Sequence, residues 1–248
     1  MNPKTLSGKV ALVTGGSRSM GAAIAKRLAA DGAAVAITYS ASPAKAEEVV
    51  RAIETAGGKA RAIQADAADE KAVRAAVTET VAAFGGLDIL VNNAGTLAIA
   101  PIEQFKIEDF DKLIAINVRG LFVATQEASK HLRDGGRIIH IGSVNADRMP
   151  FAGGSVYALT KGAVAAFTKG LARDLGPRRI TVNNVQPGPV ETDMNPAHGE
   201  IAEGLKSLMA LKRYGARDEI ASFVSYLASP EAGFITGASL TIDGGFAA

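Results

Sequence analysis

Tyr157 and Lys161 are four residues apart in a segment with helical apolar spacing, so both side chains are expected on one face of a helix. A phenol has an ordinary pKa of about 10, and a neighbouring ammonium group favours its ionised form. The pair therefore has the chemistry of a proton donor and acceptor that works near neutral pH. The same spacing also arises by chance on helix surfaces, where it means ordinary packing.

Ser143 comes directly after an expected strand, in the stretch His140-Ile141-Gly142-Ser143. Parallel sheets bind ligands in the crevice at the carboxyl ends of their strands. A hydroxyl group at that place can donate a hydrogen bond to a substrate oxygen that gains charge during a reaction. The alternative is that Ser143 is only a loop residue or a helix cap.

Asn117 lies in an apolar stretch of helical character, Leu113-Ile114-Ala115-Ile116-Asn117-Val118. A buried amide without a hydrogen-bond partner costs about 1–3 kcal/mol, so Asn117 needs one. Two interpretations stay open, namely a structural bond between helix and sheet and a part in catalysis.

A glycine-rich turn from Thr14 to Gly21 follows the first apolar run, Val10 to Val13, and opens a helix. Glycine backbones in such a turn approach a pyrophosphate closely, and the helix N-terminus attracts its charge. The turn therefore predicts a dinucleotide site. A nucleotide triphosphate loop is excluded because no Gly-Lys-Ser/Thr follows.

The end of the second expected strand indicates which dinucleotide is bound. It reads Thr38-Tyr39-Ser40-Ala41-Ser42 and lacks the carboxylate that would bind the free ribose of NAD. Arg18 is suited to a 2′-phosphate, although an exposed surface charge would look the same. We therefore predict NADP(H) rather than NAD. Asp66, after the third strand, binds adenine or caps the next helix.

Short β-rich runs alternate with helical segments along the whole chain, which predicts an α/β fold with right-handed crossovers. We expect one domain over 1–248, a doubly wound Rossmann fold with a seven-stranded parallel sheet and helices on both faces. The expected strands are 10–13, 34–38, 60–64, 89–91, 138–141, 180–185 and 239–242. The expected helices are 21–30, 43–53, 69–84, 108–132, 155–175 and 218–228. The mixed segment at about 190–214 is a candidate substrate lid, or is packed in the ordinary way.

The charge balance and residue composition exclude several classes of function. Lys and Arg total 27 and Asp and Glu total 25, a net charge of +2, and the charges are scattered, so no nucleic-acid partner is expected. Cysteine is absent, and the three histidines have no ligand spacing, so no metal is expected. No apolar run is long enough to span a membrane, and a cytoplasmic location is expected.

These motifs together resemble the short-chain dehydrogenase/reductase family, and the resemblance covers the chain from Gly8 to Gly245. The family turn reads TGxxxGxG, with Ser19 replacing its second glycine here, and the fourth strand ends in the family's NNAG. The resemblance implies a catalytic tetrad of Asn117, Ser143, Tyr157 and Lys161. Within the family, the chain resembles bacterial 3-oxoacyl-carrier-protein reductase-like members.

The resemblance also assigns roles to the tetrad. Tyr157 donates the proton in reduction, Ser143 holds the carbonyl, and Lys161 binds the nicotinamide ribose while lowering the pKa of the tyrosine. Asn117 holds a water that links Lys161 to solvent. The resemblance further implies a homotetramer. The expected coenzyme-binding residues are Gly15, Ser17, Arg18, Ser19, Met20, Gly21, Tyr39, Ser40, Asp66, Ala67, Asn93, Ala94, Gly95, Tyr157, Lys161, Pro187, Gly188, Val190 and Thr192.

The sequence thus predicts an NADP(H)-dependent oxidoreductase that reduces a ketone, either a 3-oxoacyl thioester or another small or cyclic ketone, to a secondary alcohol. An NAD-dependent alcohol or sugar dehydrogenase is the alternative enzyme. A protein that binds the dinucleotide without turnover, as a sensor, is the alternative from another class.

Overall fold

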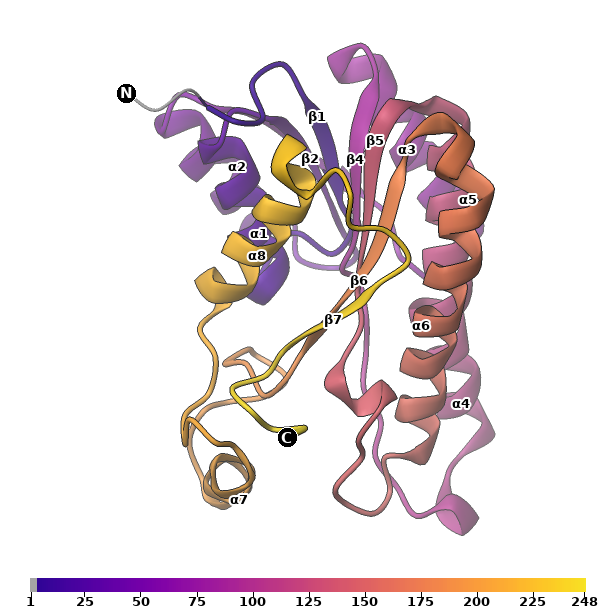
Figure 1. Cartoon of the computed structure of the whole chain (residues 1–248), viewed down its shortest axis with the longest axis vertical. Helices are drawn as coiled ribbons and strands as arrows, with labels where there is room; N and C mark the ends of the chain where they lie inside the picture. Colours follow the sequence, from indigo (N-terminus) through magenta and orange to yellow (C-terminus); the bar gives the residue numbers. More distant parts are fainter. Residues whose placement is uncertain (1–3) are drawn as a thin grey trace.

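Seven parallel strands form one sheet through the middle of the molecule (Figure 1). The computed structural model describes residues 4–248. The strands lie in the order β3-β2-β1-β4-β5-β6-β7, so the chain reverses direction across the sheet between β1 and β4. They are β1 (Val10–Val13), β2 (Ala34–Tyr39), β3 (Lys59–Gln64), β4 (Leu87–Asn92), β5 (Leu132–Ile141), β6 (Thr181–Pro187) and β7 (Ser239–Ile242). The predicted doubly wound Rossmann fold is confirmed.

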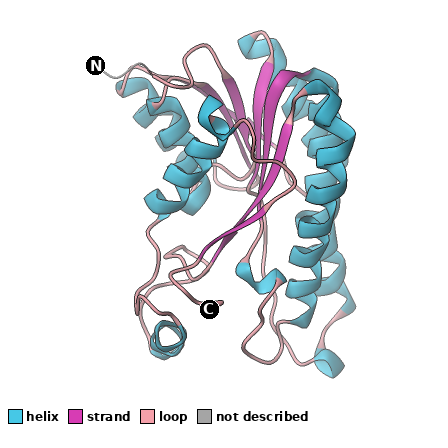
Figure 2. Ribbon diagram, viewed as in Figure 1, coloured by secondary structure: helices cyan, strands magenta, loops and turns pink. Residues whose placement is uncertain are grey.

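Helices cover both faces of this sheet (Figure 2). On one face α1 (Ser19–Ala30) packs between α2 (Pro43–Thr55) and α8 (Arg217–Ala228). The other face carries α3 (Glu70–Phe84), α4 (Ile107–Leu113), α5 (Leu121–His131) and α6 (Ser155–Leu175). A shorter helix, α7 (Glu200–Leu208), stands apart from both layers, at the lower left of Figure 1. None of the helices in 4–248 has the length and apolar character needed to cross a membrane.

The core explains why β1 is apolar at every position. Ala11 and Val13 pack toward α1 and α8, whereas Val10 and Leu12 pack toward α3 and α5. Both faces of the strand are therefore buried, as expected in a parallel sheet covered by helices. Burial of a single large aliphatic side chain contributes about 1.5–3 kcal/mol, so the central strands fix the sheet on which the loops are built.

The predicted helical region over 108–132 is confirmed as one continuous run of helical turns from Ile107 to His131. Within it the residues Ile114–Gly120 form a π-helix between α4 and α5, which begins at Leu121. The last expected helical residue, Leu132, is already paired with β4 as the start of β5. A π-turn inserts one extra residue per turn and so changes which side chains face inward, a feature that recurs at functional sites. Asn117 lies within it.

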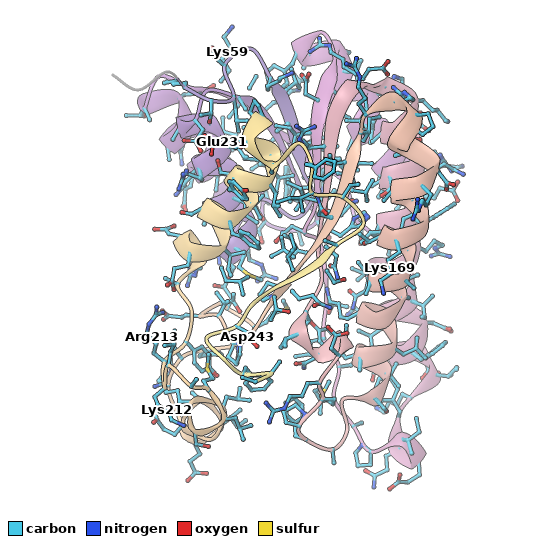
Figure 3. All side chains as sticks on the ribbon, viewed as in Figure 1. Lys59, Lys169, Lys212, Arg213, Glu231 and Asp243 are labelled. Carbon is cyan, nitrogen blue, oxygen red and sulfur yellow. The ribbon has the colours of Figure 1, made fainter. Side chains whose placement is uncertain are left out.

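The segment 190–214, which we call the lid, is anchored on the carboxyl side of the sheet. Its buried residue Met209 packs with Val144 and Phe246, and Leu205 packs against the same cluster. Met194 and Leu208, by contrast, are exposed. Arg213, labelled in Figure 3 at the end of the lid, donates hydrogen bonds of 2.9 and 2.8 Å to Glu219 of α8. The lid therefore has fixed attachments near its end and apolar side chains available on its surface.

Candidate active site

Tyr157 and Lys161 project from one face of α6, as their spacing predicts. The Lys161 amine lies 5.7 Å from the centre of the Tyr157 ring. Lys161 is buried, with 7% of its surface exposed. Its amine donates a 3.0 Å hydrogen bond to the carbonyl oxygen of Ile141 at the end of β5. The helix and the strand end thus hold the lysine in one place beside the phenol.

Ser143 follows β5 and is brought to the same point. Its hydroxyl is a hydrogen-bond partner of Tyr157 and also accepts a 3.1 Å bond from the backbone N–H of Asn145. The second bond caps the short 3₁₀ turn Val144–Ala146. Ser143 is therefore a helix cap as well as a neighbour of the phenol, so the two interpretations left open by the sequence are compatible.

Burial determines the proton affinities of this group. It raises the pKa of Tyr157, and the hydrogen bond with Ser143 lowers that pKa only in part. The direction is opposite to the one expected from Lys161 alone, because loss of water around a phenolate is the larger effect. Burial also lowers the pKa of Lys161 to about 8. At neutral pH the phenol therefore holds its proton and the amine is charged.

Asn117 is buried and completes its hydrogen bonds within the protein. Its Oδ1 accepts from the backbone N–H of Thr96 at 2.8 Å, and its Nδ2 donates to the carbonyl of Thr96 at 2.9 Å. A third bond of 3.2 Å runs from Nδ2 to Thr160 of α6. These are the contacts of the structural interpretation, since they join the π-helix, the loop after β4 and α6. The expected part of Asn117 in holding a water stays a prediction.

Three glycines of the glycine-rich turn are closely surrounded by other atoms. A Cβ at Gly21 would lie 2.3 Å from the carbonyl oxygen of Gly15, one at Gly16 would lie 2.6 Å from the side chain of Ile37, and one at Gly15 would lie 3.0 Å from the Cα of Ala94. Gly15 also has a φ of +64°, which a residue with a Cβ adopts at a cost. The turn is therefore a bare backbone surface at the N-terminus of α1, which fits the pyrophosphate of a dinucleotide. Ser17 and Met20 are partly exposed beside it.

Several predicted residues hold this turn in place. The amide of Asn93 donates to the carbonyls of Thr14 and Gly15 at 2.9 and 3.0 Å. The backbone N–H of Ala94 donates to the hydroxyl of Thr14 at 3.1 Å. Across the turn, the N–H of Gly15 donates to the hydroxyl of Thr38 at 2.9 Å. Asn93 and Ala94 thus tie the end of β4 to the turn after β1.

A pocket opens between the carboxyl ends of β1 to β4 and the helices α3 and α5. Its lining includes Thr38, Ala67, Ala94 and Gly120. Asp66 is exposed at its margin and accepts a 2.9 Å bond from the N–H of Ala68, whereas the cap of α3 is Asp69. The expected alternative in which Asp66 caps α3 is therefore wrong.

The end of β2 carries no carboxylate toward the site. Tyr39 is partly buried and Ser40 is exposed. Arg18, from the glycine-rich turn, and Lys45, from the first turn of α2, are both about half exposed and pair with Asp193 of the lid at 3.5 and 3.6 Å. Two cations, and no acidic residue at the end of β2, thus lie beside the glycine-rich turn.

The loop after β6 packs against the C-terminal segment of the chain. A Cβ at Gly188 would lie 2.6 Å from the side chain of Asp243, the residue labelled near the C-terminus in Figure 3. Val190 is buried and pairs with Gly215, while the Thr192 hydroxyl accepts a 3.1 Å bond from the N–H of Asn195. Pro187 is the last residue of β6. Gly95, after β4, lies beside two residues of the predicted tetrad, since a Cβ there would lie 3.5 Å from Asn117 and 3.8 Å from Lys161.

The three histidines lie on different elements of the structure. His140 is fully buried in β5, His131 contacts Glu127 on α5, and His198 is exposed in the lid. Across the part of the chain that the structure describes, no three His, Asp or Glu side chains are arranged to hold a metal ion.

Comparison with known proteins identifies the family. A family model described as enoyl-(acyl carrier protein) reductase matches residues 15–247. A solved short-chain dehydrogenase/reductase from Serratia marcescens is 62% identical, covers 98% of this chain and 100% of its own, and superimposes with a TM-score of 0.98. The chain belongs to the short-chain dehydrogenase/reductase family.

Two further family members are informative. A short-chain dehydrogenase from Burkholderia cenocepacia, solved in complex with NADP, is 55% identical over 98% of this chain and 100% of its own, with a TM-score of 0.97. A curated Escherichia coli relative, named a cyclic-di-GMP-binding biofilm dispersal mediator protein, is 48% identical over 98% of both chains. The first supports NADP(H) as the coenzyme.

Sequence reasoning within this family missed four residues near the site. Thr14 and Thr38 fix the glycine-rich turn through their hydroxyls, and their positions beside the turn and at the end of β2 were available signals. Lys45 and Asp193 come together with Arg18 only in the folded protein. No spacing rule joins residues so far apart, so the sequence offered no signal for that contact.

Proposed function

We propose that this protein is an NADP(H)-dependent oxidoreductase that reversibly reduces a ketone to a secondary alcohol. The observation that carries the proposal is the meeting of Ser143, Tyr157 and Lys161 at the carboxyl edge of the sheet, beside a bare glycine-rich turn. Parallel sheets bind ligands at this edge. Bound NADPH supplies the hydride that forms the new C–H bond of the alcohol.

Tyr157 is the proton donor of this proposal. Its phenol is protonated at neutral pH because burial raises its pKa. The proton passes from the Tyr157 hydroxyl to the carbonyl oxygen as that oxygen gains charge, and Ser143 donates a hydrogen bond to the same oxygen. The phenolate that remains is stabilised by the nearby Lys161 ammonium group, whose second role is to bind the ribose hydroxyls of the coenzyme. A positioned general acid accelerates such a step by about 10²–10⁴.

The preference for NADP(H) is supported by charge at the end of β2. A 2′-phosphate carries negative charge and prefers guanidinium and ammonium partners, which Arg18 and Lys45 offer. An acidic residue at the end of β2 would bind the unmodified ribose of NAD, but the chain has Tyr39 and Ser40 there. The NADP complex of the Burkholderia relative agrees with this assignment.

The substrate we propose is an apolar ketone, either a 3-oxoacyl thioester or another small or cyclic ketone. Three apolar side chains from the loops that follow β4 and β5 are well exposed, Leu97 at 43%, Ile99 at 47% and Phe151 at 40%. The backbone N–H of Ala100 bonds to Gly153, so these two loops are joined. An apolar surface of this kind suits a hydrocarbon substituent next to the carbonyl.

The decisive experiment measures NADPH consumption at 340 nm across a panel of 3-oxoacyl thioesters and cyclic ketones. We expect turnover by the wild type, a loss of about 10²–10⁴ in kcat/KM for Tyr157→Phe, and an unchanged NADPH dissociation constant. Tyr226→Phe, on α8 away from the site, is the matched control. If Tyr157→Phe keeps wild-type turnover, the assignment of the proton donor is wrong.

Two other functions are tested by the same preparation. An NAD-linked alcohol or sugar dehydrogenase would bind NADH at least as tightly as NADPH. A sensor, which the name of the Escherichia coli relative favours, would bind a nucleotide without turning over any carbonyl. Titration with NADPH, NADH and cyclic di-GMP, followed by the ketone panel, separates the three.

The quaternary structure and location that accompany this proposal are a homotetramer in the cytoplasm. Large apolar side chains are exposed on and just before α4 to α6, including Ile107 at 63%, Phe122 at 45% and Leu159 at 53%, and Phe234 is fully exposed before β7. Exposed apolar side chains of this kind favour association between subunits. Light scattering during size-exclusion chromatography gives the number of subunits directly.

A further inference from the structure

Ser19 adopts a backbone conformation that its residue type disfavours. Its φ is +48°, in the left-handed region, and it is the first residue of α1. A residue with a Cβ is less stable there than glycine, and glycine is what the family's turn has at this position. A strained residue that persists beside a binding site calls for a compensating interaction.

The compensating interaction is a pair of hydrogen bonds to the lid. The Ser19 hydroxyl donates to Oδ1 of Asp193 at 3.1 Å and accepts from the backbone N–H of Asp193 at 3.2 Å. The two residues are 174 positions apart in the sequence. Glycine at position 19 would relieve the backbone strain but would make neither bond.

Asp193 also forms two ion pairs with positively charged side chains. Oδ2 of Asp193 lies 3.5 Å from Arg18 and 3.6 Å from Lys45. Burial acts to raise the pKa of Asp193, but the Ser19 hydrogen bond and the charges of Lys45, Arg18 and Arg217 outweigh it, so the pKa is lowered. Each pair is partly exposed and weak alone. Together with the hydroxyl they hold the carboxylate against the turn.

The position of this contact gives it a function. Ser19 follows β1 and Asp193 follows β6, and β4 and β5 lie between those strands. Adjacent strands are about 4.8 Å apart, so the lid must reach over the ends of two strands to touch the turn. The tip of the lid keeps its shape because Thr192 and Asn195 bond to each other and Tyr214 bonds to Asn195. The contact therefore spans the carboxyl ends of β4 and β5, beside which the coenzyme is proposed to bind.

We propose that Ser19 and Asp193 form a latch that holds the lid closed over bound NADP(H) and slows its release. This inference rests on the proposed function, because it assumes that the coenzyme binds at the carboxyl ends of these strands. It assigns to Ser19 a positioning role that the glycine of the family's turn does not have.

The test measures the rate of NADPH dissociation by stopped-flow fluorescence, with excess NADP⁺ as the displacing ligand. Ser19→Ala and Ser19→Gly remove both hydrogen bonds, whereas Asp193→Ala removes the one to Oδ1, because the other is donated by the backbone N–H of Asp193. Each variant should accelerate release about three- to tenfold. The effects should be less than additive when Ser19→Ala is combined with Asp193→Ala, because both variants remove the hydrogen bond between the Ser19 hydroxyl and Oδ1 of Asp193. Glu203→Ala, on the exposed side of α7, is the control and should match the wild type.

A second measurement does not depend on coenzyme. Limited proteolysis should cut within 190–214 faster in Ser19→Ala and Asp193→Ala than in the wild type, with Glu203→Ala again unchanged. Unaltered release rates and unaltered cleavage, or strictly additive effects in the double variant, would overturn the latch. Failure of the wild type to bind NADPH would instead overturn the proposed function, while the cleavage rates would still report whether the lid is held by this contact.

Discussion

The amine of Lys161 donates a hydrogen bond to the carbonyl oxygen of Ile141, 3.0 Å away and two residues before Ser143. This contact joins α6 to the end of β5, so the amine, the phenol of Tyr157 and the hydroxyl of Ser143 are positioned by two rigid elements rather than by loops alone. Sites built on helices and strands hold their geometry more closely than sites on loops. The environment that fixes Lys161 also removes it from water.

That burial predicts a pH dependence. Because the pKa of Lys161 is lowered to about 8, the amine is charged below that pH and loses its charge above it. We expect kcat/KM for ketone reduction to fall as the pH rises through about 8, since the phenolate left after proton transfer then lacks its charged partner. Lys161→Arg keeps its charge over this range, so any activity that it retains should show no such inflection. A wild-type profile that is flat from pH 7 to 9 would contradict the prediction.

Coenzyme preference should depend on the two cations at the end of β2. Arg18→Ala and Lys45→Ala should each raise the dissociation constant of NADPH about tenfold, as expected for the loss of a charge-assisted hydrogen bond, and change that of NADH by less than about twofold. Isothermal titration with both coenzymes measures this difference. Lys26→Ala, an exposed lysine on α1, is the control for a general loss of positive charge. Equal losses for NADPH and NADH would show that neither side chain reads the 2′-phosphate.

The sequence predicted the sheet, and it predicted that Tyr157 and Lys161 share one face of a helix, because both depend on local signals. The apolar run of β1 and the four-residue spacing of Tyr157 and Lys161 each follow from one element's geometry. The π-helical stretch at Ile114–Gly120 was missed, because a π-turn keeps the apolar composition of an α-helix and changes only its hydrogen-bond register. The contact between Ser19 and Asp193 was missed because it depends on where two distant loops end. The raised pKa of Tyr157 was missed because burial cannot be read from spacing.

Asn117 is predicted to matter for stability as well as activity. Asn117→Ala removes all three hydrogen bonds to Thr96 and Thr160 and leaves polar groups of Thr96 without partners. We expect the free energy of unfolding to fall by about 1–3 kcal/mol, measured by urea denaturation. Asn145→Ala, at a partly exposed amide, is the control and should lower the free energy of unfolding by less than about 1 kcal/mol. A variant at 117 with wild-type stability and lost turnover would assign Asn117 to catalysis alone.

His140 makes the protein sensitive to acid. Its ring is fully buried in β5, where Nδ1 lies 3.1 Å from Asn92 and Nε2 has no partner among the described residues. Burial, with a smaller contribution from the Lys161 charge, lowers its pKa from 6.5 to about 3. Between these two values the unfolded chain binds a proton that the folded protein does not. The free energy of unfolding must therefore decrease as the pH falls below about 6.5, at roughly 1.4 kcal/mol per pH unit from this one group.

Urea denaturation at intervals from pH 7 to 4 measures that slope. His140→Gln offers an amide of similar reach that cannot titrate, so its stability should decline less steeply by roughly 1.4 kcal/mol per pH unit, whatever its stability at pH 7. His198→Gln, on the exposed surface of the lid, should reproduce the wild-type slope. Carboxylates such as Glu219, whose pKa is lowered to about 2 chiefly by its hydrogen bonds with Arg213, add the same slope to every variant and do not affect the comparison. Identical slopes for wild type and His140→Gln would mean that the buried ring takes up its proton without unfolding.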